Sequence, residues 1–186
     1  MVSGWSKEPG RGECGTYGID PKTGRSEAIL IGTYPSCGGA AGDVSPNGQS
    51  LLSYSSGELR VVDLRTGRSQ LIGMADGFGT WSPDGKWIAA LLKRGGASGL
   101  VLVDAMNIAK RRMLGRAPTS GYPVWSPDSR QLLLERSQSR CGDLLSSLEA
   151  VDVESGTRVP ITSSSCEIYT GVVGWVDSKV VPISLE

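Results

Sequence analysis

Short apolar runs alternate with turn signals along the whole chain, and the pattern repeats. One half-repeat is an apolar residue, an aspartate and a turn, with the aspartates 43, 41 and 48 residues apart: Asp20, Asp63, Asp104 and Asp152. The other is a turn such as Trp-Ser-Pro-Asp-Gly, found at 43–48, 80–85, 124–129 and, one residue shorter, 174–178. A period in the forties with short strands between tight turns is typical of a β-propeller blade. The pattern therefore predicts an all-β propeller.

Each blade is expected to hold four antiparallel strands, as residues 79–115 illustrate. Ser82-Pro83-Asp84-Gly85 predicts a turn after the inner strand, because proline presets φ, aspartate bonds to nearby backbone and glycine accepts positive φ. A buried second strand is expected at 86–92, a third strand at 99–104 and the outer strand at 109–114. The same interpretation gives further blades at approximately 42–73 and 122–162.

The remaining segments sum to one more blade. Residues 14–32 supply a third and a fourth strand, and residues 170–184 supply a first and a second. Unpaired sheet edges invite aggregation, so we expect these segments to pair and close a ring. Residues 1–186 then form one domain with four blade equivalents. Closure within one chain gives a four-bladed ring, closure between two chains gives a head-to-tail homodimer of eight blades, and a segment cut from a longer propeller leaves its edges for other strands.

The Trp-Ser-Pro-Asp-Gly turn followed by an apolar strand, at Trp81 to Gly85 and at Trp125 to Ser129, resembles the TolB-type, WD-repeat-like propeller family. The same repeat builds the non-catalytic propellers of prolyl oligopeptidase-like enzymes. The likeness covers roughly residues 14–184, although Val44 replaces the tryptophan in one repeat and the last repeat lacks the Ser-Pro pair. The resemblance implies a periplasmic protein that binds partner proteins, but it transfers no particular partner.

Charge and composition narrow the classes of partner. Nineteen basic and nineteen acidic residues give a formal net charge of zero, so no overall field steers the chain toward nucleic acid. The densest basic run, Lys110-Arg111-Arg112, is expected on an exposed outer strand. No apolar run approaches the ~20 residues that span a bilayer, so membrane insertion is not expected. The first residues also lack the apolar stretch of a signal peptide.

The four cysteines occupy matching positions of the repeat, with spacings of 23 and 25 residues. This favours two disulfides, Cys14 with Cys37 and Cys141 with Cys166, each closing a loop that contributes roughly 3 kcal/mol. Disulfides imply an oxidising compartment, periplasmic or secreted. Buried free thiols are the alternative. Zinc is disfavoured because no two cysteines lie close together and the chain has no histidine.

The absence of histidine also restricts catalysis. It removes the commonest general base and metal ligand, and with them any Ser-His-Asp or Cys-His site. No catalytic residue, metal ligand or cofactor is therefore expected. The four repeat aspartates, and Asp84 and Asp128, are interpreted as bonding to backbone in turns. The tryptophans Trp81, Trp125 and Trp175 are expected to pack between blades, and Trp87 in the core.

Candidate ligand contacts lie on the loops that enter each inner strand, because these loops line one mouth of the propeller channel. Phe78 and Tyr122 each stand three residues before an aligned tryptophan, and Tyr34 and Tyr169 occupy the corresponding longer loops. Together they suggest an aromatic mouth suited to a peptide or a sugar face. The alternative interpretation is that these aromatic residues pack only their own loops.

Three functions remain open from the sequence. The first is a non-enzymatic module that binds a protein, peptide or glycan through one propeller face. The second is a fragment or accessory domain of a larger enzyme whose catalytic residues lie elsewhere. The third is a glycan enzyme that uses a pair of carboxylates, which would require a pocket that raises the pKa of one of them.

Overall fold

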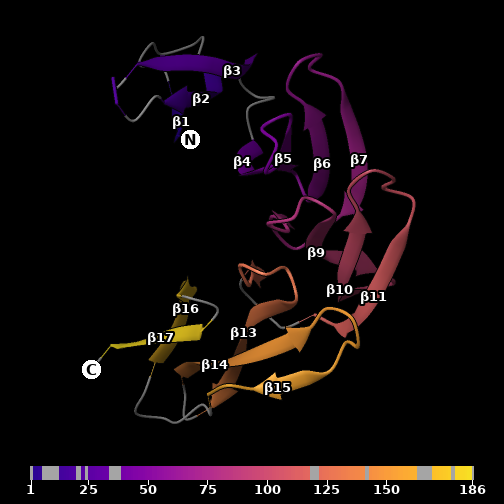
Figure 1. The fold of residues 1–186 in the computed structure, drawn as a ribbon, viewed down its shortest axis with the longest axis vertical. Coiled ribbons are helices and arrows are strands. Elements are labelled where there is room, and N and C mark those ends of the chain that lie inside the picture. The colour runs from indigo at the N-terminus through magenta and orange to yellow at the C-terminus, as the bar shows by residue number, and fades with distance from the viewer. Residues whose placement is uncertain are drawn as a thin grey trace.

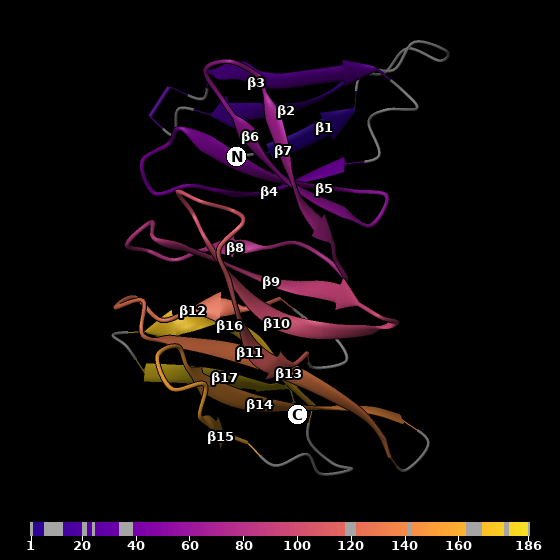
Figure 2. The same ribbon diagram turned by 90° about the vertical axis from the view of Figure 1, so that its right-hand side faces the viewer.

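The computed structural model describes residues 2–5, 13–19, 22–23, 25–33, 39–117, 122–140, 143–162, 169–176 and 179–185. These residues form seventeen strands in five antiparallel sheets. The sheets follow one another around an open arc (Figure 1) and appear from the side as successive layers (Figure 2). The predicted all-β propeller architecture is confirmed. Within the described part of the chain, no helix is long and apolar enough to cross a membrane.

The three central sheets are complete four-stranded blades in which each strand pairs with the next in the chain. The first blade contains β4 (Gly39–Val44), β5 (Ser50–Ser55), β6 (Glu58–Asp63) and β7 (Ser69–Met74). The second contains β8 (Thr80–Trp81), β9 (Trp87–Arg94), β10 (Ala97–Asp104) and β11 (Arg111–Arg116). The third contains β12 (Val124–Trp125), β13 (Gln131–Arg140), β14 (Asp143–Asp152) and β15 (Arg158–Pro160).

The two terminal sheets are partial blades. The N-terminal sheet has β1 (Val2–Trp5), β2 (Glu13–Ile19) and β3 (Ser26–Thr33), and the C-terminal sheet has β16 (Tyr169–Val176) and β17 (Lys179–Leu185). The sequence pattern did not predict β1, because four residues with Ser3 and Gly4 between two apolar ends carry little periodicity. In the described single chain the two terminal sheets remain separate, so the composite blade expected from 14–32 and 170–184 is not formed within it.

A buried serine organises the turn between the first and second strands of each complete blade. Ser82 is fully buried, and its hydroxyl donates to Asp84 Oδ1 at 2.6 Å and accepts the Trp87 N–H at 2.9 Å. Ser45 and Ser126 make the same pair of bonds in the neighbouring blades. Because the hydroxyl satisfies both ends of the turn, the turn closes without leaving a buried polar group unpaired.

The repeat aspartates that the structure describes act in turns, as predicted. Asp63 Oδ1 accepts the backbone N–H groups of Arg65 and Thr66 and the Thr66 hydroxyl. The bond from the Thr66 N–H is the largest cause of the lowered pKa of Asp63. Asp104 and Asp152 cap their turns in the same way. Asp20 lies outside the described residues.

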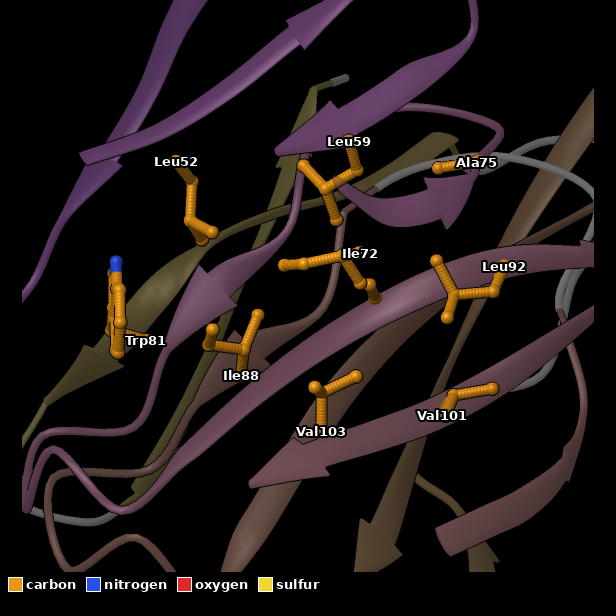
Figure 3. Close-up of a cluster of buried hydrophobic side chains, with 10 residues drawn as sticks. Leu52, Leu59, Ile72, Ala75, Trp81, Ile88, Leu92, Val101 and Val103 are labelled. Carbon is orange, nitrogen blue, oxygen red and sulfur yellow. The ribbon is translucent and has the colours of Figure 1, made fainter. Parts of the chain in front are cut away.

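The core lies between blades rather than within one sheet. Strand β9 is buried on both faces, which explains its uninterrupted apolar run. Alternate residues of β9 enter different clusters: Ile88 and Leu92 pack toward the first blade (Figure 3), and Ala89 and Leu91 toward the third. The second blade is therefore held by apolar contacts on both sides. Trp87, expected in the core, is only partly buried at the edge of the second cluster because it begins β9 directly after the turn; its ring is also covered by Arg112.

Tryptophans tie neighbouring blades together at their inner strands. Trp81 and Trp125 are 8% and 7% exposed and lie in the inter-blade clusters, as predicted. The indole of Trp125 donates to the Thr80 carbonyl of the preceding blade at 3.1 Å, and Trp175 donates to the Val124 carbonyl at the same distance. Trp81 differs, because its buried Nε1 has no hydrogen-bond partner among the described residues.

Arginines tie the same blades together at their outer strands. Arg111 donates to the Ile72 carbonyl of the first blade, and Arg112 donates to the carbonyls of Val153 and Glu154 in the third. The guanidinium of Arg112 also lies 5.9 Å from the centre of the Trp87 ring. The basic run lies at the start of the outer strand, as expected, and two of its arginines also bind the neighbouring blades. Planar guanidinium groups suit this role because several of their donors bind at once.

Candidate aromatic mouth of the channel

Four connections of the first two blades lie at one end: the β5–β6 and β9–β10 turns and the β7–β8 and β11–β12 loops. Because the strands of a blade alternate in direction, the loop that enters an inner strand lies at the same end as the turn between the second and third strands. The β7–β8 loop is further fixed by pairing of Ala75 with Leu92 and by a bond from the Asp76 N–H to the Leu91 carbonyl at 2.9 Å. This loop carries Phe78 into a defined position between the two blades.

Phe78 is the centre of a row of three aromatic side chains. Its ring lies 5.3 Å from that of Tyr54 on β5, at an interplanar angle of 63°. On the other side it lies 5.5 Å from the ring of Tyr122, at 56°. The first pair is edge-to-face, an arrangement that is favourable for aromatic rings, and the second pair is tilted. Tyr122 leaves 52% of its surface exposed, so the row ends in an accessible ring.

Glycines make room for this aromatic row. A Cβ atom at Gly42 would lie 3.1 Å from Phe78 Cδ1 and 3.0 Å from the Leu52 carbonyl oxygen. A Cβ atom at Gly77 would lie 3.1 Å from Tyr122 Cε1, and the φ of +141° at Gly77 already disfavours any other residue. The positions of the rings therefore depend on the small residues beneath them.

Two charged groups stand beside the aromatic row. Asp76, in the same loop as Phe78, pairs with Lys93 Nζ at 2.8 Å and accepts the hydroxyl of Ser98. The bond from Lys93 lowers the pKa of Asp76, and the same bond raises the pKa of Lys93. Lys93 also lies close enough to Tyr54 for an electrostatic interaction. About half of each charged side chain is exposed, so both can contact a ligand.

A partly buried carboxylate lies on β4, the inner strand of the first blade, next to the Gly42 that contacts Phe78. Asp43 follows Gly42 in β4, where the register with β5 shifts between Ala41 and Val44. Its Oδ2 accepts the Trp81 N–H from the next blade at 2.7 Å. Burial raises the pKa of Asp43, and the bonds from the Trp81 and Val44 N–H groups oppose this. Between the first and second blades, the bond across the junction therefore runs from the Trp81 backbone N–H to the Asp43 carboxylate. At the two later junctions, the corresponding bond runs from a tryptophan indole N–H to a backbone carbonyl.

The structure brings together two of the four aromatic residues that the sequence suggested, Phe78 and Tyr122. Tyr34 lies outside the described residues, and Tyr169 begins β16 with its side chain undescribed. Tyr54 was missed. Its register with Leu59 places it where the second blade has Leu91 and the third blade has Glu135, so the repeat carried no aromatic signal at this position.

The predicted disulfides cannot be placed. Cys37, Cys141 and Cys166 lie outside the described residues, and only the backbone of Cys14 in β2 is described. Among the described residues, no group of three or more cysteines and carboxylates could hold a metal ion. The arrangement as described offers an apolar aromatic surface with an adjacent ammonium and carboxylate, which is suited to binding.

Solved structures establish the class of fold as a TolB-like β-propeller. The chain is similar to TolB from Acinetobacter baumannii, with a TM-score of 0.63 and 18% identity, covering 88% of this chain and 41% of that chain. It is also similar to a TolB protein from Agrobacterium tumefaciens, with a TM-score of 0.62 and 20% identity, covering 82% and 54%. A third is the β-propeller domain of the Trilobed protease from Pyrococcus furiosus, which has an open velcro topology: TM-score 0.55, 12% identity, covering 92% and 60%.

These likenesses concern the fold. The chain spans about half the length of the two TolB chains. No family model matches the chain, and no curated protein matches it. The resemblance inferred from the Trp-Ser-Pro-Asp-Gly turns is confirmed at the level of architecture.

Proposed function

We propose that this propeller is a non-enzymatic binding module that recognises a protein, peptide or glycan through the mouth where the aromatic row lies. The row of Tyr54, Phe78 and Tyr122 supports this proposal most directly, because it ends in an exposed ring beside the Asp76–Lys93 pair. Aromatic side chains bury large areas with few rotatable bonds, and for this reason they are enriched among residues that dominate binding. The adjacent charges would orient a polar ligand.

A second candidate is an accessory propeller of a larger protein. Its support is that the chain covers 54% of one TolB chain and 20% of the tricorn protease chain. In that case the aromatic mouth would receive a substrate or a neighbouring domain rather than a free partner. A longer open reading frame around this segment would favour this candidate, and binding of a ligand by the isolated chain would favour the first.

Truncation of the aromatic row is expected to weaken ligand binding. Phe78→Ala and Tyr122→Ala should each lower the affinity for any peptide or glycan found on an array by about tenfold or more, since central aromatic contacts contribute about 2 kcal/mol. Calorimetry on the purified variants measures this loss. Met106→Ala is the matched control, because Met106 is 94% exposed on the β10–β11 turn away from the row. Affinity unchanged in both aromatic variants would place the binding site elsewhere.

We further propose that the protein lies in the periplasm or outside the cell, because the cysteine spacing favours two disulfides. Disulfides between Cys14 and Cys37 and between Cys141 and Cys166 persist only under oxidising conditions. Mass spectrometry of the unreduced protein should give a mass lower by four hydrogens than that of the reduced protein, since the chain has four cysteines. Four thiols open to alkylation before reduction would contradict both the bridges and the compartment.

A further inference from the structure

The turn between the first and second strands has the same hydrogen bonds in all three complete blades, but not the same residue at its centre. Asp84 and Asp128 occupy this position in the second and third blades, and Asn47 occupies it in the first. The Asn47 Oδ1 atom accepts the Ser45 hydroxyl at 2.7 Å and the Gln49 N–H at 3.0 Å. The two aspartates accept the equivalent donors of their own turns. An amide therefore stands where the repeat otherwise has a carboxylate.

Asn47 is followed by a glycine, which leaves its amide open to attack by the main chain. A backbone nitrogen reacts most readily with the side-chain carbon of the preceding asparagine when the attacking residue has no side chain in the way. Gly48 has a φ of +70°, and no heavy atom beyond its chain neighbours lies within 4 Å of the place that a Cβ would occupy. Asn47 and Gly48 are both exposed, so water reaches the reacting atoms.

The turn also polarises the carbon that is attacked. When the Gly48 nitrogen adds to Cγ of Asn47, negative charge develops on Oδ1. The Ser45 hydroxyl and the Gln49 N–H already donate to this atom, as the donors of an oxyanion hole do. One bond acts in the opposite direction, because the Gly48 N–H donates to the Ser45 carbonyl at 2.8 Å. A single backbone bond at an exposed turn opens at little cost, so we expect the reaction to proceed in the folded protein.

We propose that Asn47 is a site of spontaneous deamidation, and that the reaction gives the first blade the turn found in the other two. The Gly48 nitrogen bonds to Cγ of Asn47 and loses its proton, and ammonia leaves to give a cyclic imide. Water then opens the ring. Where water breaks the newly formed bond, the product is aspartate. Where it breaks the original peptide bond, the main chain runs through the side chain as isoaspartate.

The two products affect the turn in opposite ways. Aspartate keeps an oxygen at the place where the Ser45 hydroxyl and the Gln49 N–H converge, as Asp84 does in the second blade. Isoaspartate adds a carbon to the main chain and moves the carboxylate away from this place. Either product adds one negative charge to a chain whose formal net charge is zero. The turn lies at the opposite end of the blade from the β5–β6 turn, so the inference does not depend on the proposed ligand.

Peptide mass spectrometry after incubation of the full chain in mildly alkaline buffer tests the reaction. Asn47 should gain the mass difference between a hydroxyl and an amino group. Asn107 is the internal control, because it is the one other asparagine of the chain, is exposed, and has an Oδ1 that accepts the Ala109 N–H at 3.2 Å. It is followed by Ile108, whose branched side chain hinders the attacking nitrogen. Asn107 should remain intact when half of Asn47 has reacted.

Two variants transfer the site to the other blades. Asp84→Asn places an amide before Gly85, whose N–H donates to the carbonyl of the turn serine at 2.8 Å, as in the first blade. This variant should gain a second site that reacts at a rate similar to that of Asn47. Asp128→Asn places the amide before Ser129, whose side chain obstructs the attack, and should react more slowly.

Stability measurements separate the two products. Asn47→Asp should unfold in urea at a concentration no lower than the unmodified chain does. The isoaspartate form, purified by reversed-phase chromatography and refolded, should unfold at a lower concentration. Equal stability of the two forms would contradict the proposed effect on the turn.

Three results would overturn the site itself. The first is an Asn47 that stays intact in the folded protein but reacts in urea, which would mean that the Gly48 bond to the Ser45 carbonyl protects it. The second is an equal rate at Asn107. The third is an Asp84→Asn variant that retains its sheets by circular dichroism but shows no reaction at the new amide, because the shared geometry of the turn would then not be the cause.

Discussion

Trp125→Ala is expected to lower the free energy of unfolding by about 3–5 kcal/mol, the range for truncating a buried aromatic residue. The side chain is 7% exposed and packs between the second and third blades with Leu91 and Leu134. Its loss opens a cavity at the junction and also removes the bond to the Thr80 carbonyl. Chemical denaturation followed by circular dichroism measures the change. A loss below about 1 kcal/mol would show that the junction does not depend on this residue.

A comparison of two phenylalanine variants separates the hydrogen bond from the packing. Trp81 and Trp125 occupy equivalent, similarly buried positions, but only the Trp125 indole has a hydrogen-bond partner among the described residues. Trp125→Phe should therefore be more destabilising than Trp81→Phe by about 1 kcal/mol, the usual net contribution of a hydrogen bond. Equal losses in the two variants would assign the whole effect of Trp125 to packing.

Repeating features of the fold were predictable because each is encoded locally. The Ser-Pro-Asp-Gly turn needs only adjacent residues, and the bonds of Ser82 to Asp84 and Trp87 stay within one turn. The apolar run in β9 reported a strand buried on both sides, although not which residues faced which blade. Repetition also identified the strands, since an error in one blade would contradict the others.

Features that join distant segments could not be predicted from the pattern. Arg112 reaches carbonyl groups 41 and 42 residues away, and nothing near it in the sequence distinguishes these contacts from a solvated basic run. The prediction of the candidate site was incomplete for the same reason. Phe78 and Tyr122 were found through their common place in the repeat, whereas Tyr54 lies on a strand of the first blade and meets Phe78 only in the folded structure. Sequence spacing located the loops but not the contact between them.

The serine hydroxyl in the turn between the first and second strands of a blade bonds only to residues close to it in the sequence, yet we expect it to contribute strongly to stability. Ser82 has no exposed surface, so a group left without its partner there cannot bond to water. Its hydroxyl is the acceptor for the Trp87 N–H and the donor to Asp84 Oδ1. Burial has the largest influence on the pKa of Asp84 and raises it, but the bonds from Ser82 and Lys86 together outweigh burial and lower the pKa.

Ser82→Ala is expected to lower the free energy of unfolding by about 2–3 kcal/mol, because it leaves the Trp87 N–H without a side-chain acceptor in a buried site. The loss should be measured by urea denaturation. Ser69→Ala is the control, since Ser69 is exposed on β7 and should change the stability by less than about 0.5 kcal/mol. Asp84→Asn keeps an acceptor for the Ser82 hydroxyl and should fall between the two. If Ser82→Ala were as mild as the control, the turn would be held by its backbone bonds alone, namely those between Ser82 and Gly85 and between Ser82 and Trp87.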